Sequence, residues 1–406
     1  MLVAMVTLAA CNKDSGSSTP ASTISIVEKP IDVPSTSTST TASTETSAST
    51  ETSTTASTET STTASTSTVP EPEPENHEGM YRSELTNEWI DESLKDQRPI
   101  AVMVDNESTA LMHYGTTNSD IVYEMVNSTA NNRVTRLMCI VKDWRNLEQF
   151  GNIRSTRSTN MMLFPEYDAI LIHDGGPAIY LQQWYDMYKV CKTHLSAGFA
   201  RFSNGKSSTY TEYVTSESYY NAEKDTTYPG LISRIEKAKF DTEYTKNYMG
   251  KHFTFSDTEL SLENETKAKE AVNIELPFPH NSSNLKYNEE TQTYDYYEYG
   301  KLYTDALYPE EERRLSFKNV IIYTAGIEKF DDHGYMAYYA ISSPGKGEDG
   351  YYITDGYAIP IKWKKKDMEH LTKFTNAKTG EEITLNTGKT YIALVPLDAW
   401  KELVIE

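Results

Sequence analysis

Two short polar segments contain the residues best suited to bind an anion. The segment GNIRSTRS at 151–158 places Arg154 and Arg157 three residues apart, with Ser155 between them. The segment HDGG at 173–176 directly follows an apolar run. Guanidinium groups bind phosphate and carboxylate through paired hydrogen bonds, and hydroxyl and backbone N–H groups beside a helix N-terminus add further donors. These two segments therefore predict an anion-binding site.

Other charged and polar residues lie at the ends of neighbouring apolar runs, where open α/β sheets place their binding sites. We expect a ligand site built from Arg133, Arg136, Arg154, Ser155, Arg157, His173, Asp174, Gly175, Gly176, Asp105 and Asn106. The alternative is that the arginines pair internally and lock the loops. That alternative has weight in a chain with 59 acidic residues, and the nearest acids are Asp105, Asp120, Glu124 and Asp174. The two arrangements do not exclude each other.

Sequence signatures of catalysis are weak. The chain has no G-x-S-x-G nucleophile elbow, no P-loop, no dinucleotide fingerprint and no zinc-ligand spacing. An envelope enzyme acting on a phosphate-bearing glycan precursor stays possible: the arginines would hold a diphosphate, and Asp105 or Asp120 would hold a metal or act as the base. Because no nucleophile–base pair is visible, we favour a non-catalytic binding protein, and we expect no cofactor and no resident metal.

The first eleven residues predict a lipid anchor. The apolar run MLVAMVTLAA at 1–10 leads into Leu8-Ala9-Ala10-Cys11, which resembles a bacterial lipobox. No Lys or Arg precedes this run, although a secretory signal normally carries one, and a start codon assigned too far downstream would account for the difference. We expect a signal peptide at 1–10 and an acylated Cys11 in the lipid bilayer, on the outer face of the bacterial cytoplasmic membrane.

Residues 11–76 predict a disordered linker. The tract from 35 to 68 is almost entirely Ser and Thr, and the sequence STTASTET occurs at 39–46 and again at 53–60. Such a tract cannot bury enough apolar surface to offset its chain entropy. We expect a flexible tether between the membrane and a folded body that begins near Met80.

Charge and cysteine content limit the partners. The 406-residue chain has a formal net charge of −21, whereas a nucleic-acid-binding protein needs a concentrated basic face. We therefore exclude nucleic acid and expect an anionic glycan, a phosphate group or a protein as the partner. The three cysteines are too few for a disulfide framework, and we expect Cys139 to be buried in an apolar run.

The predicted elements divide the folded body in two. In the first part, 80–255, a helix is expected at 83–94, and the run 121–126 is ambiguous between strand and helix. Strands are expected at 100–104, 137–141 and 169–173, and helices at 158–164, 178–190 and 231–239. Alternating strands and helices favour an α/β layer.

The second part, 270–406, follows a polar connector at 256–270 and contains short strand-like runs separated by turns. The Asp355-Gly356 pair predicts a hairpin turn. The basic run at 362–366 either forms a solvated face or contacts an anionic wall polymer or lipid headgroups. The overall expectation is an α/β (α+β) protein with an N-terminal mixed α/β domain and a C-terminal β-rich domain.

Several stretches together resemble the YerB-like lipoprotein family. In the first half they are RPIAVMVDN at 98–106, SDIVYE at 119–124, GNIRSTRS, and YDAILIHDGG at 167–176; in the second half they are FKNVIIY at 317–323, GYYITDGYAIPIKWKKKD at 350–367 and GEEITLNTGKTYIALVP at 380–396. The resemblance implies an anchored extracytoplasmic cell-envelope protein of Gram-positive-type bacteria with two domains of unknown function. It implies no reaction. The arginine segment usually reads GPVRSAR in that family, and this chain keeps both arginines.

Overall fold

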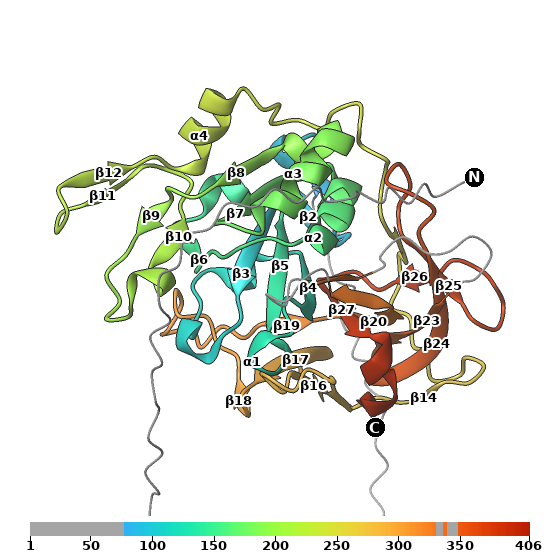
Figure 1. The fold of residues 1–406 in the computed structure, drawn as a ribbon. Helices are drawn as coiled ribbons and strands as arrows, with labels where there is room; N and C mark the ends of the chain where they lie inside the picture. Colours follow the sequence, from blue (N-terminus) through green and yellow to red (C-terminus); the bar gives the residue numbers. More distant parts are fainter. Residues whose placement is uncertain (1–76, 330–335, 339–347) are drawn as a thin grey trace, which may run out of the picture. The chain divides into compact units, whose positions relative to one another are not determined.

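A large mixed sheet organises the part of the chain that this computed structural model describes, which is residues 77–329, 336–338 and 348–406. Eleven strands form it, and Figure 1 shows its central strands β3, β5 and β4 side by side. In spatial order they are β14 (Lys269–Glu270), β24 (Tyr357–Lys364), β23 (Glu348–Thr354), β20 (Asn319–Ala325), β27 (Thr390–Pro396), β4 (Ile121–Val126), β5 (Thr135–Val141), β3 (Ile100–Asp105), β7 (Ile170–His173) and β8 (His194–Ser196), with β25 (Lys373–Asn376) paired to β24.

The two halves of the sequence share this sheet. Strand β27 from the second half runs parallel to β4 from the first half, with Thr390 opposite Ile121 and Leu394 opposite Met125. The four α-helices of the described residues all precede residue 240, and the second half is β-rich, as the sequence predicted. These helices are α1 (Ala130–Arg133), α2 (Ser158–Leu163), α3 (Ala178–Met187) and α4 (Leu231–Ala238).

Both faces of the central strands are covered. Every residue of β3, β4 and β5 is buried, which explains why the run 121–126 shows no clear alternation of polar and apolar residues. On one face, the Tyr123 hydroxyl lies 2.7 Å from the Tyr167 hydroxyl of the 3₁₀-helix Phe164–Tyr167, which directly follows α2. On the other face, Glu124 contacts a second sheet.

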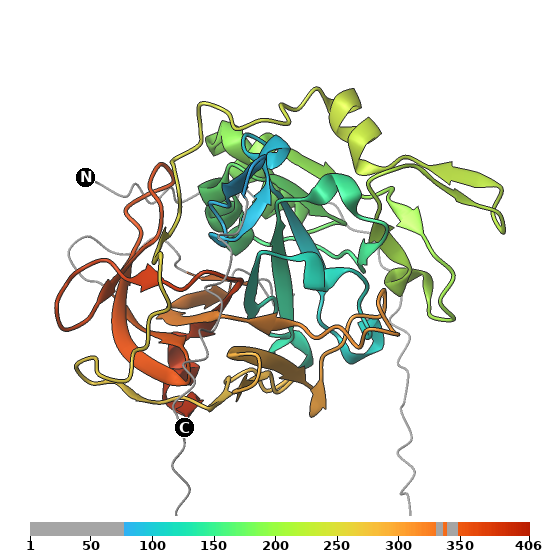
Figure 2. The same ribbon diagram turned by 180° about the vertical axis from the view of Figure 1, so that it is seen from behind.

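The second sheet has six strands and buries tyrosines against the large sheet. The Tyr294 and Tyr296 side chains point inward from the same strand, and both are fully buried. In both views, the second sheet lies toward the bottom and helices α2 and α3 lie toward the top (Figures 1 and 2). Its strands are β18 (Lys301–Leu302), β17 (Thr293–Glu298), β16 (Asn284–Asn288), β15 (Asn273–Glu275) and β28 (Val404–Ile405), with β19 (Ser316–Phe317) paired to β17.

Several short elements complete the fold. The remaining strands are β1 (Met80–Arg82), β2 (Trp89–Asp91), β6 (Phe150–Gly151), β9 (Ala200–Arg201), β10 (Glu212–Val214), β11 (Tyr219–Asn221), β12 (Thr226–Tyr228), β13 (Thr254–Phe255), β26 (Thr384–Leu385), β21 (Ile327–Lys329) and β22 (Met336–Tyr338). Within the described residues, no helix has the length and apolar character needed to cross a membrane.

The helix expected at 83–94 is wrong. The chain turns at Ser83, whose backbone N–H donates to the Glu88 carbonyl at 2.9 Å, and β2 then pairs with β1 as a hairpin. Only the 3₁₀-helix Glu92–Leu94 follows. The hairpin turn expected at Asp355-Gly356 is confirmed, since Thr354 pairs with Tyr357 across it.

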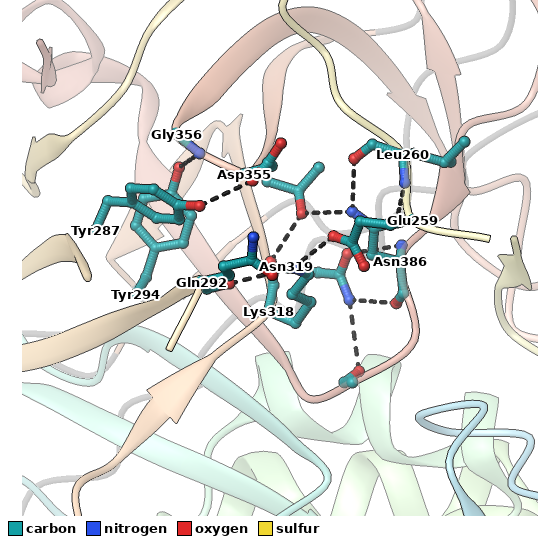
Figure 3. A network of polar contacts seen from close by, with 12 residues as sticks. Glu259, Leu260, Tyr287, Gln292, Tyr294, Lys318, Asn319, Asp355, Gly356 and Asn386 are labelled. Carbon is teal, nitrogen blue, oxygen red and sulfur yellow. Dashed lines mark hydrogen bonds and ion pairs between the residues drawn. The ribbon is translucent and has the colours of Figure 1, made fainter. Parts of the chain in front are cut away.

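The connector between the halves is fixed by the polar network drawn in Figure 3. The Leu260 N–H donates to Asn386 Oδ1 at 2.7 Å, and Asn386 Nδ2 donates back to the Leu260 carbonyl at 2.8 Å. Asn319 Nδ2 in turn donates to the Asn386 carbonyl at 2.8 Å. Because these groups satisfy one another, the network is structural.

The basic run 362–366 is not one solvated face. Lys364 and Lys366 are exposed, but Lys365 is fully buried, and its Nζ lies 3.1 Å from Glu166 Oε1. His252 Nε2 lies 2.7 Å from the other oxygen of Glu166. A buried ammonium needs such a partner, so the position of Lys365 is set by this ion cluster rather than by solvent.

Candidate functional site

The two polar segments singled out in the sequence lie side by side. The Asp174 N–H donates to the Arg154 carbonyl at 3.1 Å, and the Thr156 N–H donates to the Gly175 carbonyl at 3.2 Å. Residues 173–176 begin at the end of β7, and the Arg154 N–H donates at 2.8 Å to the Met103 carbonyl of β3, the strand that lies parallel to β7. Both segments therefore lie at the carboxyl ends of these two strands. We call residues 151–158 and 173–176 the paired loops.

Arg154 is held in place but not saturated. Its Nε lies 2.7 Å from Oδ2 of Asp105, a fully buried carboxylate, while the Arg154 side chain is 28% exposed. Arg136 approaches the other oxygen of Asp105 at 3.6 Å from within the protein. The two terminal nitrogens of Arg154 make no hydrogen bond to any residue that the structure describes. The buried ion pair therefore orients a guanidinium whose outer edge stays available.

The paired loops also contain backbone donors. Within the described part of the chain, the amides of Ser155, Gly175 and Gly176 have no hydrogen-bond partner. Gly176 has φ of +148°, and a Cβ there would lie 2.5 Å from Leu181 Cδ1 and 3.0 Å from the Thr156 carbonyl oxygen. Glycine is thus needed for the loops to approach so closely, and the same two loops carry both Arg154 and the three amides.

The four arginines do not all converge. Arg157 Nε donates to the Asn127 carbonyl at 3.2 Å, and its Nη1 donates to the Thr156 carbonyl at 2.8 Å. Arg133, expected to join the site, instead forms a two-pronged ion pair with Asp398, with one contact of 2.8 Å. The cause lies in the topology of the sheet. Asp398 follows β27, which pairs with β4, so the shared sheet brings Asp398 next to Arg133 in the turn after β4.

Four of the expected ligand residues are buried supports. Asp105, Asn106, Arg136 and His173 have little or no exposed surface. His173 uses both ring nitrogens, on the Gly175 carbonyl at 2.8 Å and on His194 at 3.0 Å, and burial lowers its pKa to about 4. His173 is therefore neutral near pH 7, and its two hydrogen bonds stabilise the loop from the protein interior.

Two residues beside the loops were missed in the sequence. Arg201 Nη2 lies 2.7 Å from Glu212 Oε2 and 3.8 Å from Asp174 Oδ2. Burial, reinforced by the nearby Asp174 carboxyl, raises the pKa of Glu212 to about 7. Arg201 and Glu212 come from β9 and β10, which pair only in the folded state, and no local spacing signals their meeting.

The two carboxylates named for the enzymatic alternative, Asp105 and Asp120, do not lie close together. Asp105 aligns with Arg136 of β5, whereas Asp120 precedes the Ile121–Ile140 pair near the other end of β5. Five residues of strand place the two carboxylates roughly 15 Å apart. Asp120 accepts the Lys142 N–H at 2.7 Å, and burial raises its pKa to about 6. No group of three or more potential metal ligands was found among the described residues.

Glu124 forms no ion pair with an arginine of the described residues, so the alternative of internal arginine pairing does not hold for this carboxylate. Its carboxylate is fully buried, and six neutral side chains donate hydrogen bonds to it. Oε1 accepts from Asn106, Thr135, Asn281 and Ser283, and Oε2 accepts from Tyr296 and Tyr391. Four of these donors come from the second half of the chain, so Glu124 joins the two halves.

Comparison with known proteins agrees with this two-part construction. Residues 85–229 match the family model described as protein of unknown function (DUF3048) N-terminal domain, and residues 274–392 match the corresponding C-terminal domain. The chain belongs to this two-domain family. The resemblance to YerB-like proteins in the sequence is thereby confirmed.

Two comparisons, one of sequence and one of structure, give the extent of the likeness. A Bacillus subtilis (strain 168) protein named "Putative lipoprotein YerB" is 25% identical over 327 residues, covering 78% of this chain and 87% of the relative. The crystal structure of the Bacillus subtilis YerB protein matches with a TM-score of 0.58 and 19% identity, covering 80% of this chain and 99% of that one. This structural likeness shows a shared fold.

The family domains can now be placed on the geometry. Both paired loops lie within the DUF3048 N-terminal domain. Glu124 belongs to the same domain, and its four donors from the second half belong to the C-terminal domain. The two DUF3048 domains therefore meet at a buried carboxylate, and the candidate ligand site lies wholly in the first of them.

Proposed function

We propose that this DUF3048 protein is a membrane-anchored cell-envelope lipoprotein that binds an anionic wall-associated ligand through the paired loops, without catalysing a reaction on it. The observation that carries the proposal is the arrangement of Arg154. Its Nε is fixed by buried Asp105, its outer nitrogens make no hydrogen bond to a described residue, and the paired loops that carry it contain three amides without a partner in the described part of the chain. A preorganised guanidinium with adjacent N–H donors suits a phosphate or carboxylate group.

The positions of the carboxylates in the described part of the chain favour binding over catalysis. An enzyme would need an arginine and an unpaired carboxylate facing a common site. Asp105 is held by Arg154 and Arg136, and Asp174 lies near Arg201. Glu212 has a pKa near neutrality, but it is almost fully buried and accepts the Phe199 N–H at 2.9 Å. Asp105 and Glu212 are thus buried and paired, and Asp174 is the one of these three carboxylates that is partly exposed, with Arg201 at 3.8 Å.

The proposed location rests on the N-terminal sequence and on the printed name of a relative. Cys11 and the Ser/Thr-rich linker fall outside the described residues, so acylation of Cys11 and the tether function stay predictions from sequence. The Bacillus subtilis relative is named as a lipoprotein. Mass spectrometry of the membrane-extracted protein tests the anchor, since an acylated Cys11 would carry the added mass of its lipid chains.

Calorimetry with the full-length chain in neutral detergent tests ligand binding. Inorganic phosphate and glycerol phosphate serve as small probes. The double variant Arg154→Ala/Arg157→Ala should abolish binding and leave the β-rich half folded, and Arg154→Ala alone should weaken binding at least tenfold. Arg145→Ala is the matched control, since Arg145 is exposed and lies outside the loops. Unchanged affinity in the double variant would contradict the proposal.

A further inference from the structure

A basic groove lies outside the paired loops. Two hollows of about 480 and 380 Å³ adjoin each other and share Met249 and Glu369 in their linings. Six exposed lysines line them, three from each half of the chain: Lys189, Lys246, Lys251, Lys364, Lys366 and Lys373. Glu369 is the one carboxylate among the lining residues. We call this surface the lysine groove.

The concentration of charge is notable because the chain as a whole is acidic, at −21. Four of the six lysines, Lys189, Lys246, Lys251 and Lys364, form no ion pair with any described residue. Lys373 pairs with Glu382 at 2.7 Å, and Lys366 lies 3.9 Å from Asp367. Like charges that lie close together without counter-charges repel one another. An anion bound in the groove would reduce this repulsion between the lysines.

The groove also offers apolar contacts. Met187, Met249, Met368 and Leu371 line it, and Met187 is 61% exposed. Methionine side chains adapt their shape to irregular apolar surfaces. A ligand with regularly placed negative charges and a carbon skeleton between them would satisfy both the lysines and these side chains.

We propose that the lysine groove binds an extended polymer with a phosphodiester backbone, so that successive phosphates meet lysines from both halves of the protein. Lysine ammonium groups bind phosphate as point charges and need no fixed geometry, which suits a flexible chain. The six lysines line hollows rather than a convex surface, which favours a polymer strand over the plane of a bilayer. The proposal does not depend on the paired loops, because none of their residues lines the groove.

The test uses a synthetic poly(glycerol phosphate) chain and the full-length protein in neutral detergent. Fluorescence anisotropy of the labelled polymer gives the affinity at several salt concentrations. The triple variant Lys189→Gln/Lys246→Gln/Lys364→Gln should bind at least tenfold more weakly. Three lost phosphate contacts at about 0.7 each should also reduce the slope of log K against log salt by about 2.

A matched control and a second probe make the outcome decisive. The variant Lys237→Gln/Lys301→Gln/Lys378→Gln removes three exposed lysines outside the groove and should bind like the unaltered protein. Equal loss in both triple variants, or salt-independent binding by the unaltered protein, would overturn the proposal. Groove-dependent binding to phosphatidylglycerol vesicles without polymer binding would also overturn it.

Discussion

Removing single donors to Glu124 should destabilise the whole folded body. The clearest case is Tyr391→Phe. This change deletes one hydroxyl that donates to Glu124 Oε2, and it keeps the buried aromatic ring in place. A hydrogen bond to a charged group contributes about 1.5–3 kcal/mol. We therefore expect the free energy of unfolding to fall by about 1.5–3 kcal/mol in Tyr391→Phe, and by a similar amount in Tyr296→Phe.

Removing the acceptor itself should be far more damaging. Glu124→Ala would remove the acceptor of six buried donors. The Asn106 and Asn281 amides would keep Thr135 and Ser283 as acceptors, and the Ser283 and Tyr296 hydroxyls lie 3.1 Å apart, so about three hydroxyls would lose their only acceptor, each at a cost of about 1–3 kcal/mol. The sum, roughly 3–9 kcal/mol, is a large part of the stability of an entire domain, about 5–15 kcal/mol. We expect Glu124→Ala to lose most of its stability, whereas Glu124→Gln keeps the shape and should be intermediate.

Urea unfolding of the chain without its first eleven residues, followed by tryptophan fluorescence and by circular dichroism, measures these differences. Constant m-values across the hydroxyl variants would show that only stability has changed. Tyr287→Phe is the control, because its hydroxyl bonds to Asp355 on the protein surface rather than to Glu124. A folded Glu124→Ala protein of unaltered stability would refute the reasoning that this carboxylate holds the two halves together.

Two further predictions concern pH. Burial and the neighbouring Glu124 raise the pKa of Glu298 well above its usual value of 4.5, so the folded protein keeps this proton to a higher pH than the unfolded chain does. Stability should therefore fall as pH rises above about 4.5. Glu298→Gln should remove that slope, so that urea melts show the variant gaining stability relative to the unaltered protein as pH rises. Burial disfavours the charged form of Glu166, but Lys365 and His252 outweigh it and lower its pKa from 4.5 to about 2. The ionised Glu166 should contribute about 3 kcal/mol to the free energy of unfolding above pH 4.5, and this contribution should be lost progressively as the pH falls toward 2. Acid titration of Glu166→Gln should lack that loss.

The sequence predicted local structure where patterns are local. Strand β3 (Ile100–Asp105) and helix α4 (Leu231–Ala238) match their expected ranges closely, because an apolar run and a helix that begins after a proline are both recognised from adjacent residues. Cys139 is buried as expected. The helix expected at 83–94 failed because its periodic pattern also fits a hairpin, and pairing with β1 decides between them.

The candidate site was only partly predictable. Residues 173–176 begin at the end of the strand expected at 169–173, but the chain reaches residues 151–158 from β6, and the contact of that segment with the end of β3 could not be inferred from chain order. The sequence also could not indicate which arginine stays available, since that depends on the ion pairs of Arg154 with Asp105 and of Arg133 with Asp398. The lysine groove was only partly predictable: the basic run 362–366 contributes Lys364 and Lys366, but Lys189, Lys246 and Lys251 come from distant segments that meet this run only in the folded chain.

Asp105 and Asn106 connect the two main features of the molecule. They are adjacent at the end of β3, yet Asp105 fixes Arg154 of the paired loops, whereas Asn106 donates to Glu124 and accepts the Tyr299 hydroxyl of the second half on its carbonyl at 2.7 Å. A shift of the second half against the first would therefore move Asn106 and, through one peptide bond, the carboxylate that orients Arg154. The contacts around Glu124 thus help to fix the Arg154 guanidinium in the folded chain, so the proposed binding at the paired loops would not meet the entropic cost of ordering that side chain.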